Sequence, residues 1–374
     1  MPEKKLDFQK FSIKKIVKES YKIFNFLQII FGSILPVKKI YPRIFYGGLR
    51  SGNIGGPLVK IKKLKEYFPE YKYRFNIVYT TSSNYFLTKS AIKHLKKKNY
   101  PIILNQNGVF YPAWFEGNCQ KRNLLNKYLY HNADYVFWQS KFCKNASETF
   151  LGKRNGSGEI LYNAVNTEIF KPINKTKNNF HFLITGNITK KNNYRILSVL
   201  KALIDVLKYD PKICLIIAGN IVDKNYFVSE SKRLGIINHV KFLGKFKQED
   251  APKIYQMADA YITMSYQDNC PSAVLEAMSC GLPILYSASG GIPELVDEYS
   301  GIGLEVASSW QSIAIPDRKA IAEGMINILE NKINMSKSSR IRAIEKFDIR
   351  YWHKRHEYVF DYYFKKFYKL SKNF

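Results

Sequence analysis

The stretch "DNCPSAVLEAMSCGLPIL", residues 268–285, predicts a loop, a helix and a buried strand in succession. Pro271 suits the first helical position, because its missing N–H is one that a helix cannot use. The free N–H groups of residues 272–274 would then point out of the helix end, as an anion site requires. Asp268 before the helix and Glu276 one turn into it add carboxylates to the same place, although a helix cap or a lysine partner would also explain them.

The same alternation of short apolar runs and amphipathic segments fills the chain from residue 43 onward. Runs of about five buried residues with helices between them are typical of parallel sheets with crossovers. We expect strands at 43–48, 74–80, 100–108, 133–140, 159–163, 180–186, 213–219, 240–244, 260–265, 283–287 and 301–306. Helices near the C-terminus are expected over 317–331, 336–347 and 350–370. The predicted fold class is α/β, with two doubly wound Rossmann-like domains in tandem.

The polar stretch 171–179 interrupts the alternation and predicts an interdomain linker. It separates an N-terminal domain over 1–170 from a C-terminal domain over 180–349. Residues 350–374 predict a last helix that packs back on the N-terminal domain. Ligands of such folds bind outside the carboxyl ends of the strands, so the cleft between the domains is the expected site.

The chain has 374 residues and a formal net charge of +29. Such a charge favours anionic partners: nucleic acid, an acidic membrane face or phosphate-bearing substrates. A composition biased towards lysine would give the same charge as solvated surface. The five cysteines are odd in number and show no C-x-x-C spacing, so we expect neither a disulfide framework nor a zinc site. A reduced cytoplasmic compartment without a signal peptide is the resulting expectation.

Residues 21–37 form the most apolar early segment, but Lys22, Asn25 and Gln28 interrupt it. Its clean apolar part is shorter than the roughly 20 residues that span a bilayer. The segment is therefore either a core helix or, because several lysines precede it, an interfacial helix on anionic lipid. Residues 1–40 are a candidate membrane-surface segment.

Two further strand-end loops carry candidate binding groups. Gly186 ends one strand, and Lys190 and Lys191 follow just before a helix, where an ammonium and helix N–H groups can hold an anion together. A solvated basic loop is the alternative. Gly244 and Lys245 end another strand, where bare backbone could meet a flat ring.

The C-terminal half resembles the nucleotide-sugar-binding domain of retaining GT-B-fold glycosyltransferases of family 4, the group 1 glycosyltransferases. The resemblance rests on "NAVNTEIF" (163–170), "ITGNITKKN" (184–192), "VKFLGKF" (240–246), "YQMADAYITMS" (255–265), the stretch 268–285 and "SGGIPELV" (289–296), in the family's order and spacing. The N-terminal half fits more loosely, through its Gly-rich loop, "PIILNQNGV" (101–109) and "ADYVFWQSKFC" (133–143).

This resemblance implies that Glu276 binds the ribose, that Asp268 contacts the donor sugar, and that Lys191 helps the amides near Ser272 to hold the diphosphate. The expected donor-binding residues are Gly55, Gly56, Gly186, Asn187, Lys190, Leu243, Gly244, Asn269, Cys270, Pro271, Ser272, Ala273 and Glu276. The residues expected to act in catalysis are Asp268, Lys191 and Asn107.

Three positions depart from the family pattern. Asp268 stands where the family has Glu, and Asn187 stands where it has Arg, which leaves Lys190 or Lys191 to carry more of the charge. Asn107 replaces a histidine; it can hydrogen-bond a sugar hydroxyl but cannot exchange protons near neutral pH. These departures concern donor identity and rate more than the class of reaction.

The implied reaction moves a sugar with retention from a nucleotide-sugar donor, UDP- or GDP-linked, to a glycan or lipid-linked hydroxyl. The sequence offers no second carboxylate that could act as a covalent nucleophile. We therefore expect front-face attack by the acceptor hydroxyl, with the leaving phosphate oxygen as base. No metal or other cofactor is expected, because the chain lacks a D-x-D motif and its histidines show no ligand spacing. Bacterial surface polysaccharide or lipopolysaccharide synthesis, in the cytoplasm or peripheral to the membrane, is the expected setting.

Two alternatives stay open. A sugar-nucleotide epimerase of the same architecture would need acid and base groups in the N-terminal half of the cleft, where the loop 105–118 offers Glu116 but no histidine. A nucleic-acid-binding protein would explain the charge, but it would need its lysines on one face with interleaved aromatics. The lysines are dispersed instead, so we expect no nucleic-acid partner.

Overall fold

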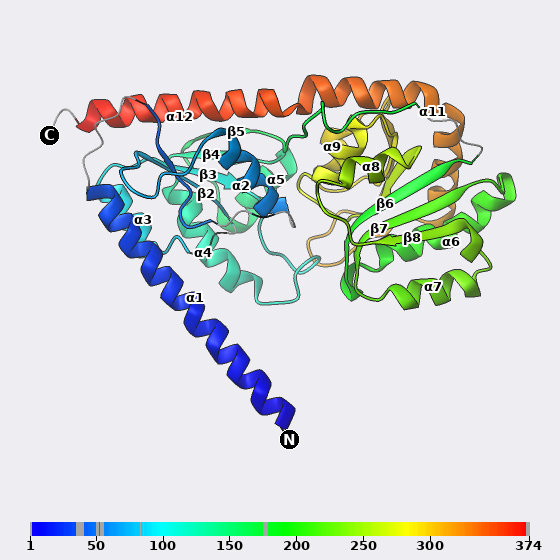
Figure 1. Cartoon of the computed structure of the whole chain (residues 1–374), viewed down its shortest axis with the longest axis horizontal. Helices are drawn as coiled ribbons and strands as arrows, with labels where there is room; N and C mark the ends of the chain where they lie inside the picture. Colours follow the sequence, from blue (N-terminus) through cyan, green and yellow to red (C-terminus); the bar gives the residue numbers. More distant parts are fainter. Residues whose placement is uncertain are drawn as a thin grey trace.

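The computed structural model describes residues 2–34, 41–49, 52, 56–82, 84, 86–174 and 179–371, with the side chains of 2–15, 56 and 369–371 outside the description. It contains two separate parallel sheets, placed side by side and each flanked by helices (Figure 1). The change from one sheet to the other falls between Ile160 and His181. The predicted α/β class with two sheet-containing halves is therefore correct.

The first sheet follows the order of the chain, β1-β2-β3-β4-β5, and all its pairs are parallel. Its strands are β1 (Ile44–Phe45), β2 (Ile77–Thr81), β3 (Ile102–Gln106), β4 (Tyr135–Trp138) and β5 (Ser157–Ile160). Its helices are α1 (Pro2–Ile34), α2 (Gly56–Tyr67), α3 (Lys89–Lys97), α4 (Cys119–Asn132) and α5 (Lys141–Leu151). Because successive strand residues face opposite sides, Val78 packs with α1, α3, α4 and α5, whereas Tyr79 packs with α2 and the C-terminal helix.

The second sheet has the order β11-β10-β9-β6-β7-β8 and is also parallel. Its strands are β6 (His181–Ile188), β7 (Cys214–Ile221), β8 (Val240–Gly244), β9 (Ala260–Thr263), β10 (Ile284–Ser287) and β11 (Gly301–Leu304). Its helices are η1 (Lys190–Asn192), α6 (Tyr194–Tyr209), α7 (Lys224–Arg233), η2 (Ile237–His239), α8 (Ala251–Gln256), α9 (Ser272–Ser279), α10 (Ile292–Leu295) and α11 (Arg318–Phe347). The strand order reverses between β6 and β9, which is where such sheets bind ligands.

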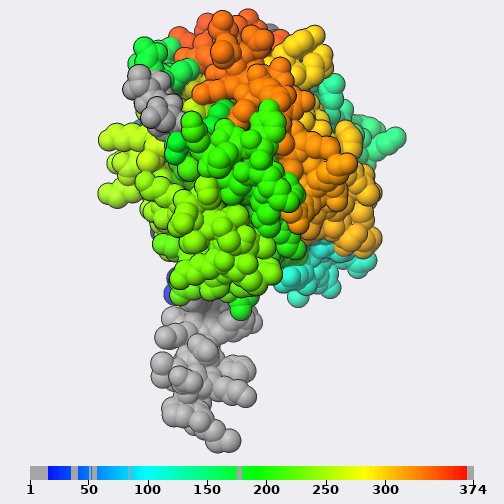
Figure 2. Space-filling view, turned by 90° about the vertical axis from the view of Figure 1, so that its right-hand side faces the viewer, coloured from blue at the N-terminus to red at the C-terminus, as the bar shows by residue number. Residues whose placement is uncertain are grey.

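Two long helices join the halves. The chain from 318 to 347 forms one helix, α11, where the sequence predicted two, because no glycine or proline interrupts the intervening residues. Figure 2 shows α11 (orange) against the green segment that holds α6. At Asp348 the backbone is extended, and α12 (Ile349–Ser371) then runs over the first sheet (Figure 1). Trp352 and Phe360 of α12 join the core of the first half.

The predicted linker and the domain limits at 170 and 180 stay predictions, since residues 175–178 lie outside the described residues.

Contacts of α12 with the first half include an ion pair of 2.9 Å between Arg355 and Glu159. The Tyr363 hydroxyl also donates to the Asp134 carbonyl at 2.9 Å. These contacts fix the end of the chain on the N-terminal half.

Helix α1 has one buried face and one exposed apolar face. Asn25 donates hydrogen bonds to the carbonyls of Gly47 and Phe86, and Ile29 is buried in the core. The exposed apolar side chains of α1 are Ile16, Val17, Ile23, Phe24, Leu27, Phe31 and Ile34. Among the residues that the structure describes, no helix is long and apolar enough to cross a membrane.

Candidate functional site

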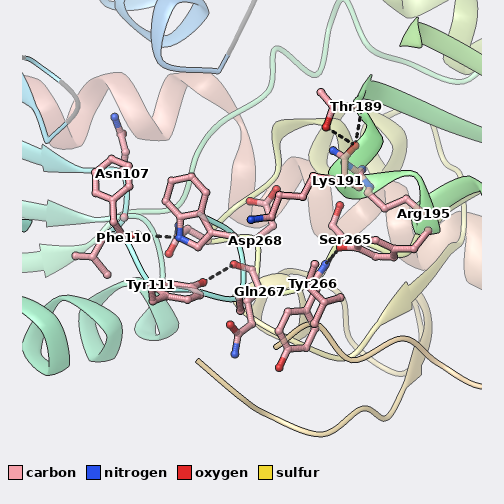
Figure 3. A pocket seen from close by; sticks show the side chains of 18 of the residues that line it. Asn107, Phe110, Tyr111, Thr189, Lys191, Arg195, Ser265, Tyr266, Gln267 and Asp268 are labelled. Carbon is pink, nitrogen blue, oxygen red and sulfur yellow. Dashed lines mark hydrogen bonds between the residues drawn. The ribbon is translucent and has the colours of Figure 1, made fainter. Parts of the chain in front are cut away.

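A cavity of about 450 Å³ lies at the switch point of the second sheet, between the two halves of the chain. The loops after β6 and β9 supply Lys191 and Asp268 on one side, and the loop after β3 supplies Asn107, Phe110 and Tyr111 on the other (Figure 3). The three residues expected to act in catalysis, Asp268, Lys191 and Asn107, therefore line one cavity although they are far apart in the sequence.

Asp268 lies in the middle of this cavity wall. Burial raises the pKa of its carboxyl group, while the nearby charge of Arg195 and the backbone N–H groups of Asn269 and Cys270 lower it by a smaller amount. The Cys270 N–H donates to Asp268 Oδ1 at 3.2 Å. These contacts hold the carboxylate at the start of the loop that leads into α9.

Asn269, a predicted donor-binding residue, reaches across to the N-terminal half. Gly108 faces it with a φ of +143°, and a Cβ at that position would lie 2.6 Å from Asn269 Nδ2. Only glycine permits both the backbone angle and this close approach. The carbonyl of Asn269 is similarly close to Gly291, where a Cβ would come within 2.0 Å of the oxygen.

The loop after β6 divides its predicted residues between two places. Lys191 lines the cavity, and its ammonium lies 3.7 Å from the exposed carboxylate of Glu116. Lys190 borders a separate small recess that also contains Asp223. Asn187 is exposed and accepts a hydrogen bond of 2.7 Å from Asn220. The structure therefore favours Lys191 over Lys190 as the cation of this loop.

Arg195 is a cavity residue that the sequence analysis missed. It lies in the first turn of α6, and its guanidinium borders Gly186, where a Cβ would lie 3.6 Å from Nη2. Its charge reaches Asp268. The chain thus has no arginine at position 187 but has one in the cavity wall eight residues later. Only the helical periodicity after the loop could have indicated this.

The N-terminus of α9 differs in detail from the prediction. Pro271 precedes the helix as its N-cap, and the Val274 N–H is already used, since it donates to the Pro271 carbonyl at 3.1 Å. In the described part of the chain, the N–H groups of Ser272 and Ala273 have no protein acceptor. The anion site stays a prediction, and two amides rather than three are left for it.

Cys270 joins the α9 loop to the end of the first half. The backbone N–H of Asn163 donates to the Cys270 sulfur at 3.2 Å, and its side-chain amide donates to the Cys270 carbonyl at 2.6 Å. Cys270 is buried, so its predicted role at the donor would be through its backbone.

Glu276 lies one turn into α9, as predicted, and the structure shows that it is buried. Its two oxygens accept hydrogen bonds of 2.9 Å from Gln248 Nε2 and from the Tyr255 hydroxyl. Burial raises the pKa of the carboxyl group, and Lys63 of α2 lowers it by a smaller amount. Each carboxylate oxygen has a second lone pair left for a ligand hydroxyl.

The predicted base-binding backbone lies at the end of β8. Leu243 packs against the core of the C-terminal half. Gly244 has a φ of +77° and nothing within 4 Å of a Cβ built on it, so a ring could approach the chain there. Of the glycines predicted in the N-terminal half, Gly56 is the first residue of α2, and Gly55 lies outside the described residues.

Asn107 belongs to a buried polar network that includes Lys60, another residue that sequence reasoning missed. Lys60 Nζ donates to Asn105 Oδ1 at 2.9 Å and to Asn107 Oδ1 at 3.2 Å. Gln139 Nε2 donates to the same two oxygens. Nothing in the sequence distinguishes Lys60 from the chain's many other basic residues. Over the residues described, no three His, Cys, Asp or Glu side chains gather as metal ligands.

Comparisons with known proteins agree with this geometry. Residues 165–346 match the family model for group 1 glycosyl transferases. An uncharacterized glycosyltransferase of Methanocaldococcus jannaschii is 28% identical over 295 residues, which cover 73% of this chain and 71% of that protein. Spore coat protein SA of Bacillus subtilis is 32% identical over 123 residues, or 31% of this chain and 32% of that protein.

Solved structures share the fold. Sucrose-phosphate synthase from Thermosynechococcus elongatus has a TM-score of 0.63 at 19% identity, covering 84% of this chain and 83% of that one. The Anabaena protein HepE, in complex with UDP, has a TM-score of 0.61 at 19% identity, covering 81% and 82%. At such identities the likeness shows the GT-B fold alone. The family match over residues 165–346, together with the similar glycosyltransferase sequences, shows that the C-terminal half of this chain is similar to the group 1 glycosyl transferases.

Proposed function

We propose that the protein transfers a sugar, with retention of anomeric configuration, from a nucleoside diphosphate donor to a hydroxyl of a glycan or lipid-linked acceptor. The observation that carries this proposal is the convergence of Asp268, Lys191 and Arg195 on one cavity at the switch point of the second sheet. The N–H groups of Ser272 and Ala273, which have no acceptor among the described residues, lie at the start of α9, directly after the Asp268 loop.

The donor is proposed to lie along the C-terminal half. Glu276 would accept hydrogen bonds from the ribose hydroxyls, and the backbone at Gly244 would border the base. HepE is bound to UDP-glucose in a further solved complex, with a TM-score of 0.54 to this chain. We propose a UDP- or GDP-linked sugar, because the site offers amides and cations to a diphosphate in either case.

The proposed chemistry is a front-face displacement. The bond from the anomeric carbon to the phosphate oxygen breaks as the acceptor oxygen bonds to the same carbon, and the acceptor proton passes to the leaving phosphate oxygen. Negative charge grows on the diphosphate, so preorganised donors there lower the barrier most. Lys191, Arg195 and the α9 amides would supply them, while Asp268 would hold a hydroxyl of the sugar. No step requires a metal.

The acceptor side of the cavity is aromatic. Phe110 and Trp114 stack with ring centroids 5.1 Å apart, and the Trp114 indole donates to the Val109 carbonyl at 3.0 Å. Such rings suit a sugar face or a lipid-linked glycan. The epimerase alternative would need an acid or base here, but Glu116 is 81% exposed at the rim and faces Lys191.

A membrane partner is proposed for α1. Its seven exposed apolar side chains recur at the spacing of one helix face, and exposed lysines 89, 93 and 97 lie on α3, which α1 contacts. An apolar stripe beside basic side chains is typical of a helix that lies in an anionic lipid interface. We therefore propose a peripheral protein of the cytoplasmic membrane face that acts in surface polysaccharide or lipopolysaccharide synthesis.

Release of nucleotide from donor sugars tests the function. Purified protein is incubated with UDP-glucose, UDP-N-acetylglucosamine or GDP-mannose in the presence of simple glycoside acceptors. NMR then follows free nucleotide and the anomeric signal of the product. We expect one donor to be consumed and to give a product of the same anomeric configuration. An inverted product would contradict retention, and an epimerised donor without transfer would favour the epimerase.

A further inference from the structure

We propose that Lys60 of α2 binds the diphosphate of the donor, so that the N-terminal half contributes a cation to the leaving group. This inference rests on the proposed function and adds a residue that neither the motifs nor the family match, which begins at residue 165, includes. The N-terminus of α9, at Ser272 and Ala273, would bind the same diphosphate from the C-terminal half.

Lys60 is a buried cation held by neutral groups. It is 7% exposed, and its ammonium donates to the side-chain oxygens of Asn105 and Asn107. An ammonium carries three N–H groups, so one is left over. Within the described ranges Lys60 forms no ion pair with a carboxylate. A buried charge is normally paired, because its desolvation is otherwise costly.

The recess beside Lys60 holds a second lysine, Lys63, whose ammonium also interacts with Glu276. A recess of about 20 Å³ between the halves is lined by Lys60, Lys63, Asn163 and Ser272. Ser272 begins α9, whose N-terminal end carries a partial positive charge. A cation and a helix N-terminus that face one recess are favourable together only when an anion joins them.

The size of the recess indicates when that anion enters. About 20 Å³ holds a water molecule but not a phosphate. A diphosphate between Lys60 and Ser272 would therefore require the two halves to lie farther apart than in this structure. The bonds from Asn163 to Cys270, which join the halves beside the recess, would have to lengthen or break for it to enter.

A preorganised network fixes the direction of Lys60. Gln139 Nε2 donates to Asn105 Oδ1 at 3.2 Å, so both asparagine oxygens accept from two donors. Burial lowers the pKa of the Lys60 ammonium to about 8. A bound diphosphate would favour the protonated form and so gain affinity from this group. The alternative is that Lys60 only satisfies the buried asparagine oxygens.

Calorimetric titration of UDP, UMP and uridine separates these roles, with GDP and guanosine as a second set. The variants are Lys60→Met and Lys60→Gln; the latter can still donate to the asparagine oxygens but carries no charge. Lys337→Met, an exposed lysine on α11, is the matched control. We expect both Lys60 variants to bind the diphosphate 10- to 100-fold more weakly, as for loss of a charged hydrogen bond, with nucleoside affinity unchanged.

Each other outcome overturns the proposal. Wild-type affinity for the diphosphate in both variants would make Lys60 purely structural while the proposed function stands. Equal losses of affinity for the diphosphate and for the nucleoside would show that Lys60 does not act through the phosphate groups. Failure of the wild-type protein to bind any of these nucleotides would remove the proposed function itself, and the Lys60 proposal with it.

Discussion

The carboxylate of Glu294, on α10 of the C-terminal half, accepts the backbone N–H of Lys141 at 2.7 Å and so caps α5 of the N-terminal half. The Phe142 N–H and the Tyr162 hydroxyl donate to the same carboxylate. An anion at a helix N-terminus is stabilised by free N–H groups and by the helix dipole. This contact lies across the cleft, so it favours the closed arrangement of the two halves.

Removing the Glu294 cap should weaken the contact between the two halves of the chain. We expect Glu294→Ala to increase the radius of gyration in small-angle scattering, and to lower kcat/KM by about 5-fold, since an N-cap contributes about 1 kcal/mol. Glu298→Ala, an exposed carboxylate nearby, is the control and should change neither quantity. An unchanged scattering profile with full activity would show that Glu294 does not hold the halves together.

Asp268 should affect transfer more than nucleotide binding, because it is proposed to touch the sugar and not the base. Asp268→Asn keeps the shape and should lower kcat by about 100-fold or more, in line with loss of one preorganised polar contact in a transition state. Calorimetric affinity for the free nucleotide should stay within about threefold. Strong loss of nucleotide affinity with unchanged kcat would reverse this assignment.

The affinity for the nucleoside diphosphate should fall as the pH rises from 7 to 9.5. Burial lowers the pKa of Lys60 to about 8, so the ammonium loses its proton in this range and with it the attraction for an anion. The last phosphate ionisation, at about 6, is complete throughout. Calorimetry at several pH values measures the trend. Lys60→Met should show a smaller fall.

Three other titratable groups near Lys60 keep their charge over this pH range. Burial raises the pKa of the Cys143 and Cys270 thiols to about 12 and lowers that of His356 to about 3, so none of them changes charge. Burial also lowers the pKa of Lys63. The affinity of the Lys63→Met variant is therefore measured at the same pH values. An identical pH trend in wild type and Lys60→Met would assign the titration to another group.

The α1 stripe should bind anionic vesicles. We expect wild-type protein to sediment with phosphatidylglycerol-containing vesicles and much less with pure phosphatidylcholine, and to be released by salt in part. The double variant Phe24→Ser and Phe31→Ser should lose most of this binding. Ile333→Ser, at an exposed apolar residue on α11, is the control. Vesicle binding that survives the double variant would exclude the stripe as the lipid contact.

The sequence predicted most of the sheet strands and the cavity residues Asp268, Lys191 and Asn107, because strand-end positions in a parallel fold converge by topology. It could not predict Arg195, whose place depends on how the chain turns between β6 and α6. It also missed Lys60, since only the packing of α2 against the cleft separates it from surface lysines. Asn187 and Lys190 show the converse, being in the motif but turned away from the cavity.

The central claim is that the cleft binds a nucleotide sugar through Glu276. Calorimetric titration of UDP, GDP and ADP, each with and without a common attached sugar, tests it most directly, with Glu276→Ala and Glu276→Gln beside wild type. Tight binding of one nucleotide that weakens at least 10-fold in both variants is the predicted result. No binding of any nucleotide by folded wild-type protein would contradict the account.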